Sequence, residues 1–195
     1  MRISAAALSA ILLATGMAAG HAETLQGQFT GSAEMVCLNS ANGFDANLQP
    51  NDPNRASIST RSVLGLLNFN GSGGGTESST EVATSTPVKV SASSTPQANS
   101  SQSSGAFTDT VGAGNVVTIT TSNLSGTFLT GPETGETFVV DQVVMSGFLS
   151  PDGSTLILAS PTTNIETATL STGKIIQRVC HRSGVFVLNP PANPS

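Results

Sequence analysis

The sequence predicts an all-β protein, an antiparallel meander of strands that closes into a small β-barrel. Three observations support this fold class. Ser, Thr, Gly, Asn and Val dominate, and only 10% of the residues are charged, which disfavours helices. The second half alternates short β-like runs with turn signals, without a helical period. Two cysteines near the ends of the folded region can join the first and last strands, where the edges of a meander meet. A β-sandwich is the alternative.

The first 22 residues predict a secretory signal peptide. They comprise a basic residue, Arg2, an apolar run over 5–14 and a cleavage region of mostly small residues at 19–22. Cleavage after Ala22 leaves residues 23–195, which we expect to form a single all-β domain. The apolar run is too short for a membrane span and no second one follows, so we expect a secreted or periplasmic protein.

Charge and aromatic content exclude several classes of partner. Residues 23–195 hold twelve acidic and six basic side chains, a net side-chain charge of −6, which repels nucleic acid. The chain has no Trp and no Tyr, although sugar-binding faces stack ligands on exposed aromatic rings and outer-membrane barrels carry aromatic girdles. We therefore expect no nucleic-acid partner, and neither a sugar-binding face nor an integral barrel.

The two cysteines, Cys37 and Cys180, predict one disulfide. In an oxidising compartment, a bridge between the start and the end of the domain is the favoured interpretation. The alternatives are a free nucleophilic thiol and a metal pair of Cys180 with His181. Adjacent strand residues point to opposite faces, which disfavours the metal pair.

The first half of the chain holds weaker strand signals. Residues 25–30 and 34–38 predict one strand broken at Gly31-Ser32, or two strands around a turn. A long connection is expected over 39–54, and a further strand over 58–69. The glycine run over 71–75 is expected to be a hairpin connection.

From residue 80 onwards, one polar segment separates two β-rich regions. Residues 80–93 favour strand, with Pro87 at an edge or a break. Residues 94–105 are almost wholly Ser, Gln, Asn and Thr, and are expected to be a mobile loop because they offer little to bury. The strands predicted beyond it are 106–111, 115–121, 125–129, 137–145, 155–159, 166–170, 174–181 and 185–188.

Alternation along these runs predicts which side chains face the interior. The inward candidates are Val117, Ile119, Phe138, Val140, Leu156, Leu158, Ile175, Val179, Phe186 and Leu188. The residues expected to face solvent are Thr118, Thr120, Asp141, Gln177 and Arg178.

Short patterns in these strands resemble those of a known group. Leu66-Leu67-Asn68-Phe69-Asn70-Gly71, Ser125-Gly126-Thr127-Phe128 and Phe138-Val139-Val140 are similar to segments of uncharacterised secreted bacterial proteins with lipocalin-like (calycin-type) barrels. The resemblance extends over residues 25–188 and implies a small barrel. It implies no catalytic residues, and the Gly-x-Trp signature of true lipocalins is absent.

No residue set predicts catalysis. After loss of the signal peptide, His181 is the only histidine, and Ser183 can share its face, but no nucleophile elbow is present. Paired carboxylates that glycosidases use could come from Glu133 with Glu136, or from Glu77 with Glu81. Acids at turns are usually solvated, so both pairs stay unassigned.

Calcium is the metal that the sequence comes nearest to predicting. Asp45, Asp52 and Asp152 lie in loops, yet no twelve-residue acidic loop pattern is present. No metal site and no cofactor are assigned.

The resulting functional prediction is a non-catalytic secreted or periplasmic barrel that binds a small apolar ligand or a partner protein. Binding of a small apolar ligand would require an interior cavity of several hundred cubic ångströms lined by Val, Leu, Ile and Phe. The alternative is a structural or adhesive surface subunit, suggested by the Ser/Thr/Asn-rich composition. An enzyme of unrecognised type is the third hypothesis.

Overall fold

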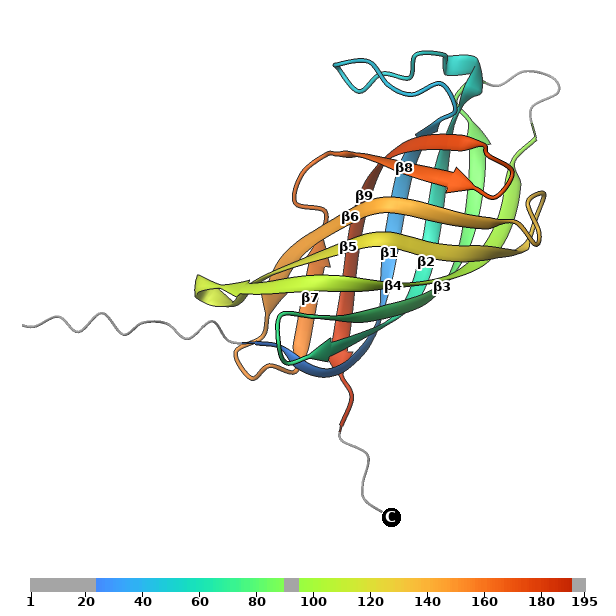
Figure 1. Cartoon of the computed structure of the whole chain (residues 1–195). Helices are drawn as coiled ribbons and strands as arrows, with labels where there is room; N and C mark the ends of the chain where they lie inside the picture. Colours follow the sequence, from blue (N-terminus) through green and yellow to red (C-terminus); the bar gives the residue numbers. More distant parts are fainter. Residues whose placement is uncertain (1–23, 90–94, 191–195) are drawn as a thin grey trace, which may run out of the picture.

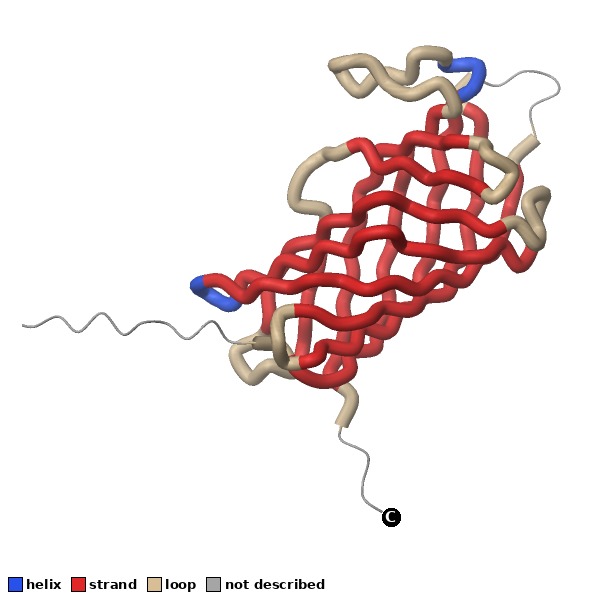
Figure 2. The backbone as a smooth tube through the Cα atoms, viewed as in Figure 1, coloured by secondary structure: helices blue, strands red, loops and turns tan. Residues whose placement is uncertain are grey.

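The computed structural model describes residues 24–89 and 95–190, which form nine strands and two single-turn 3₁₀ helices (Figure 1). The strands are β1 (Gln26–Ser40), β2 (Ala56–Asn70), β3 (Gly74–Pro87), β4 (Gln97–Gly112), β5 (Val116–Thr130), β6 (Thr137–Leu149), β7 (Thr155–Ala159), β8 (Ile165–Leu170) and β9 (Ile175–Leu188). The helices are η1 (Pro53–Arg55) and η2 (Ala113–Asn115). Strands make up nearly the whole wall, and loops lie mainly at its ends (Figure 2).

The strands close into an antiparallel barrel with eight strand positions. Each strand from β1 to β6 pairs with the next, and β1 pairs with β9. Strands β7 and β8 both pair with β6 on one side and β9 on the other, so they share one position that is interrupted at residues 160–164. The predicted meander barrel is confirmed. We call the end where the chain enters β1 and leaves β9 the terminal end, and the opposite one the loop end.

Cys37 and Cys180 form the predicted disulfide across the closing pair of strands. They are direct register partners of β1 and β9, with their Cα atoms 4.1 Å apart, and both are buried. The bridge therefore links the first strand to the last within the barrel wall.

The segment expected to be a mobile loop, 94–105, is largely strand. Residue 94 lies outside the described residues, but 97–105 form the first half of β4, so the loop prediction is wrong there. Hydroxyl pairs tie this polar strand to its neighbours: Ser79 Oγ lies 2.8 Å from Ser103 Oγ, and Ser100 Oγ lies 2.8 Å from Thr130 Oγ1. Backbone pairing on both sides and these cross-strand bonds replace the apolar burial that the segment lacks.

A row of small residues crosses the barrel wall at Gly31. The sequence left open whether the first strand breaks at Gly31-Ser32. Strand β1 continues through Gly31, and a Cβ atom there would lie 2.1 Å from the carbonyl oxygen of Val185. Successive register partners of this row are Phe186, Gly31, Gly65, Ser79, Ser103, Gly126 and Phe138. The five small residues leave room inside the barrel for the two phenylalanine rings at the ends of the row.

Two apolar clusters occupy the interior at different heights. The cluster at the terminal end contains Phe29, Phe69 and Phe107, whose rings meet edge to face with centroids 5.0 to 5.5 Å apart. The cluster towards the loop end is built around Phe138 and Val140. Polar and charged side chains lie between them, around a small cavity.

The predicted interior is correct for most strands and wrong for one. Val117, Ile119, Phe138, Val140, Leu156, Leu158 and Phe186 are buried, and Leu188 is partly buried against the core. In β9, however, Ile175 is exposed, Val179 faces outwards and Arg178 is buried. Alternation in β9 therefore places the even-numbered residues from Ile176 to Arg182 inside, and an acidic partner makes the burial of arginine tolerable.

Candidate functional site

The centre of the barrel holds a buried ion cluster around Glu166. This carboxylate of β8 is 1% exposed. Arg178 donates from Nε to Oε2 at 2.9 Å, and Arg182 donates from both Nη groups, with the Nη2–Oε2 pair at 2.6 Å. Both arginines lie on β9 and are buried. Burial is the main cause that lowers the pKa of Arg178 to about 10, and repulsion by Arg61 adds to it.

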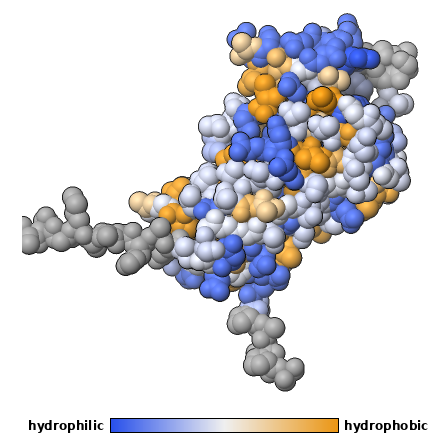
Figure 3. Space-filling model, in the orientation of Figure 1, coloured by the Kyte–Doolittle hydropathy of each residue, from blue (hydrophilic) through white to orange (hydrophobic). Residues whose placement is uncertain are grey.

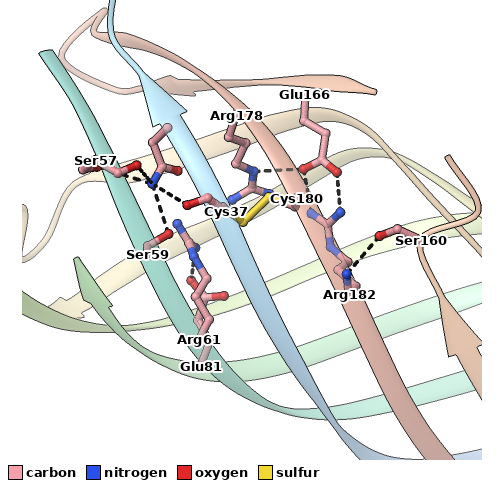
Figure 4. The surroundings of a disulfide bond; sticks show 11 residues. Cys37, Ser57, Ser59, Arg61, Glu81, Ser160, Glu166, Arg178, Cys180 and Arg182 are labelled. Atoms are coloured by element: carbon pink, nitrogen blue, oxygen red, sulfur yellow. Dashed lines mark hydrogen bonds and ion pairs between the residues drawn. A yellow bond between two sulfur atoms is a disulfide. The ribbon is translucent and has the colours of Figure 1, made fainter. Parts of the chain in front are cut away.

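A second acidic residue binds the third interior arginine. Arg61 of β2 donates from Nη1 to Oε1 of Glu81 at 2.7 Å, and Ser101 of β4 donates to the same oxygen at 2.9 Å. Figure 4 shows both ion pairs on either side of the disulfide, with Glu166 between Arg178 and Arg182. The bridge and the interior charges thus belong to one layer of the barrel.

Glu77 is the remaining acidic side chain of this layer. Burial raises its pKa above 4.5, and the positive charge of Arg182 partly opposes the rise. The hydroxyl of Thr121 opposes it too, although it falls short of full hydrogen-bonding geometry. In the folded protein the neutral form of Glu77 is therefore favoured more strongly than in the unfolded chain.

Replacing Glu77 with Gln is expected to change how stability depends on pH. Because the folded state binds the proton more tightly, the stability that Glu77 contributes is present below pH 4.5 and is lost as pH rises through the folded pKa. The free energy of unfolding of Glu77→Gln should therefore improve relative to wild type as pH rises above 4.5, as measured by urea titration. Glu34→Gln, at an exposed site on the outer face, is the control. A difference that is constant with pH would contradict the prediction.

A cavity of about 220 Å³ opens into the barrel at the loop end. We call it the mouth cavity. Its basic lining residues are Arg55, Arg61, Lys174 and Arg178, and Glu133 is the acidic one. Its apolar lining residues are Ala41, Ala83, Phe128, Phe138, Ala168, Leu170 and Ile176. Basic and apolar groups therefore share one small space.

The large apolar cavity expected inside the barrel is not present in the described part of the chain. The interior cavity between the two apolar clusters has a volume of about 90 Å³, and Glu77, Glu81 and three arginines are among its lining residues. Phenylalanine rings and ion pairs fill the remainder. The interior cavity is therefore smaller than the several hundred cubic ångströms expected for an apolar ligand.

The outer wall carries a broad shallow groove of about 1190 Å³ beside the row of small residues. Hydroxyl and amide side chains dominate its outward-facing lining, together with Leu64, Leu66 and valines of β6 and β9. Figure 3 shows the visible face as mainly pale, with separate apolar patches.

The residues considered for a hydrolytic site do not come together. His181 and Ser183 are exposed on the outer face of β9, whereas acidic Glu166 lies inside the barrel. His181 is the register partner of Val36. The disulfide also removes Cys180 as a nucleophile or metal ligand.

The paired carboxylates have separate structural partners. Glu133 lies 3.5 Å from Lys174 Nζ, and Glu136 accepts from Thr172 at 3.1 Å, so the two acids hold neighbouring turns together. Glu77 and Glu81 both point inwards from β3, where Glu81 pairs with Arg61 and burial raises the pKa of Glu77. Glu133 lines the mouth cavity without Glu136, whereas Glu77 and Glu81 share an interior cavity of only about 90 Å³.

Each of the three loop aspartates accepts hydrogen bonds within the turn in which it lies. Asp45 accepts from the backbone amides of Asn47 and Gln49, and Asp52 caps η1 through the amide of Asn54. Asp152 accepts from the hydroxyl groups of two serines and one backbone amide, which lowers its pKa to about 2. No group of three or more His, Cys, Asp or Glu side chains suited to a metal ion occurs within residues 24–89 and 95–190.

The interior arginines are the residues that sequence reasoning missed, although a signal was present. If Cys180 faces the interior, Arg178 and Arg182, each two residues away, must share its face. Glu166 carried no comparable signal, because its position opposite β9 depends on strand pairing across the barrel.

Comparisons with known proteins show no family. No family model matches the chain, and no curated protein matches it either. The resemblance to lipocalin-like barrels is therefore not confirmed. Among solved structures, Neisserial surface protein A is similar at 11% sequence identity and a TM-score of 0.48, over 84% of this chain and 98% of that protein. A likeness at this level carries no information about function.

The described part of the chain contains no helix that is long and apolar enough to span a membrane.

Proposed function

We propose that the protein is an exported, non-catalytic β-barrel that binds a small molecule in its mouth cavity. The observation that carries this proposal is the combination of a filled barrel interior with a cavity at one end that offers both charged and apolar contacts. Binding sites for small molecules typically combine an apolar lining with a few convergent polar groups. The catalytic candidates have structural partners or lie apart, which supports a binding role.

The outer wall supports an aqueous location, secreted or periplasmic, for the exported barrel. A lipid-facing barrel needs an apolar band about 25 Å tall with aromatic girdles. Here the outward register row of Val82, Ser62, Glu34, Ser183, Ala159 and Ser146 crosses the wall, and four of its six members are polar or charged. The next row towards the loop end is also mostly polar, with Thr84, Thr60, Val36 and His181. These rows interrupt the continuous apolar band that a bilayer requires.

The test is a titration of the folded protein with a library of small molecules, followed by amide shifts in NMR spectra. We expect the shifts from a binding compound to concentrate around the mouth, at residues such as Gln97 and Lys174. The variant Ser85→Phe, which places a ring in the cavity from β3, should abolish them. Binding that persists in this variant, or a library without any binder, would contradict the proposal.

A structural or adhesive subunit is the second candidate, and one feature of the outer wall favours it. Val116, Phe148, Ile157 and Val185 are register neighbours on four adjacent strand positions, and all are exposed. Exposed apolar patches often mark contact surfaces. Sedimentation that depends on concentration, and that Ile157→Ser abolishes, would support this role, whereas a monomer at high concentration would count against it.

A further inference from the structure

The mouth cavity gathers positive charge in an acidic protein. The whole chain carries a net charge of −5 and only seven Lys and Arg residues, yet four of the seven line this one cavity. Glu133, the acidic lining residue, is already paired with Lys174 at the rim. A concentration of one charge sign in a partly enclosed cavity raises the local concentration of ions of the opposite sign.

The inner end of the cavity offers hydrogen-bond donors. Arg61 uses Nη1 for Glu81, and among the described residues no acceptor pairs with its Nη2. Arg178 uses Nε for Glu166, and within the described ranges its two Nη groups have no protein acceptor. A guanidinium has five N–H donors in a planar fork that suits a carboxylate. Two arginines with donors to spare therefore line the same space.

The two guanidinium groups also repel each other. The charge of Arg61 helps to lower the pKa of Arg178, after the larger effect of burial. Each arginine has its own acidic partner, Glu81 or Glu166, deeper in the barrel. An anion in the mouth cavity would lie near both positive charges and reduce this repulsion.

The remaining wall is apolar and limits the size of the ligand. Phe128 and Phe138 lie with ring centroids 5.0 Å apart, and Leu170 and Ile176 complete the apolar lining. A volume of about 220 Å³ equals the space of roughly seven water molecules at about 30 Å³ each. This volume suits a compact ligand with one charged end and one apolar end.

We propose that the mouth cavity binds a small organic carboxylate, with its carboxylate on Arg61 and Arg178 and its apolar part against Phe128 and Phe138. This inference rests on the proposed function and adds the chemical class of the ligand. Lys174 and Arg55 contribute positive charge at the opening.

The test compares benzoate, benzamide and inorganic phosphate as probes of the wild-type protein by NMR titration at pH 7. Benzoate and benzamide have nearly the same shape and differ in charge, while phosphate has charge without an apolar part. We expect benzoate to bind at least about tenfold more tightly than either of the others, with shifts around the mouth. Equal binding of benzamide or phosphate would overturn the carboxylate assignment.

A charge-neutral double variant tests the role of Arg61 without leaving its acidic partner unpaired. Arg61→Gln with Glu81→Gln removes both charges of the pair, and the amide spectrum shows whether the barrel stays folded. Benzoate affinity should fall at least about tenfold, while benzamide binding stays unchanged. Unchanged benzoate affinity in the folded variant would overturn the inference.

If the double variant does not fold, Lys174→Met at the exposed rim provides the second measurement. It should weaken benzoate binding about twofold or more and leave benzamide binding unaltered. No change in benzoate binding would count against the inference.

These experiments distinguish failure of the carboxylate assignment from failure of the proposed binding function. If benzamide binds as well as benzoate and Ser85→Phe blocks both, the binding function stands and the ligand class is wrong; if no library compound binds at all, the proposed function fails as well.

Discussion

Replacing Glu166 with Gln is expected to lower the free energy of unfolding by about 3–5 kcal/mol, the typical result of removing one partner from a buried ion pair. The carboxylate is 1% exposed and receives hydrogen bonds from Arg178 and Arg182. A neutral amide keeps the shape of the side chain but leaves two guanidinium charges buried with less compensation. Urea unfolding at pH 7 measures the loss.

Two further variants show whether charge is the cause. Glu34→Gln removes an exposed carboxylate and should change the free energy of unfolding by less than about 0.5 kcal/mol. The triple variant Glu166→Leu, Arg178→Met and Arg182→Met replaces the whole ion cluster by apolar groups, and should be far less destabilised than Glu166→Gln alone. A Glu166→Gln variant as stable as wild type would show that the arginines find other partners or reach water.

Removing the disulfide with Cys37→Ala and Cys180→Ala is expected to destabilise the protein by about 2–5 kcal/mol, because the bridge restricts the unfolded chain. The cysteines are 143 residues apart, and a loop of this length gives about 5 kcal/mol on the entropic model. For a chain of this size, the midpoint of thermal unfolding should fall by roughly 5 to 15 °C. Calorimetry of the two proteins measures the shift.

Because the disulfide is buried, its reduction in the wild-type protein provides a control for the double variant. Because Cys37 is 0% and Cys180 3% exposed, reductant should reach the bridge only when the barrel opens, so reduction should speed up with added urea. Reductant should lower the melting temperature of wild type to that of the double variant and leave the variant itself unchanged. Rapid reduction under native conditions would contradict a bridge enclosed by the barrel wall.

Strand pairing explains why the two halves of the chain differed in how well they could be predicted. From residue 106 onwards, apolar alternation such as Val117 with Ile119 marks the inner face, and the structure confirms it except in the first part of β9, where Arg178 is buried and Ile175 exposed. Residues 97–105 have no such alternation, because their inner face is built from small and polar groups that bond across strands. A single sequence does not show the neighbours that make such a segment a strand.

By itself the sequence determined the fold class, the antiparallel meander and the pairing of Cys37 with Cys180, since each depends on local turn signals, on composition or on there being two cysteines. Only the tertiary structure decided what the interior contains. Ion pairs such as Arg178 with Glu166 form across strands of a closed barrel, and arginine becomes a core residue only when closure brings an acid to it. The mouth cavity depends on the same closure, because its basic and apolar residues come from strands far apart in the sequence.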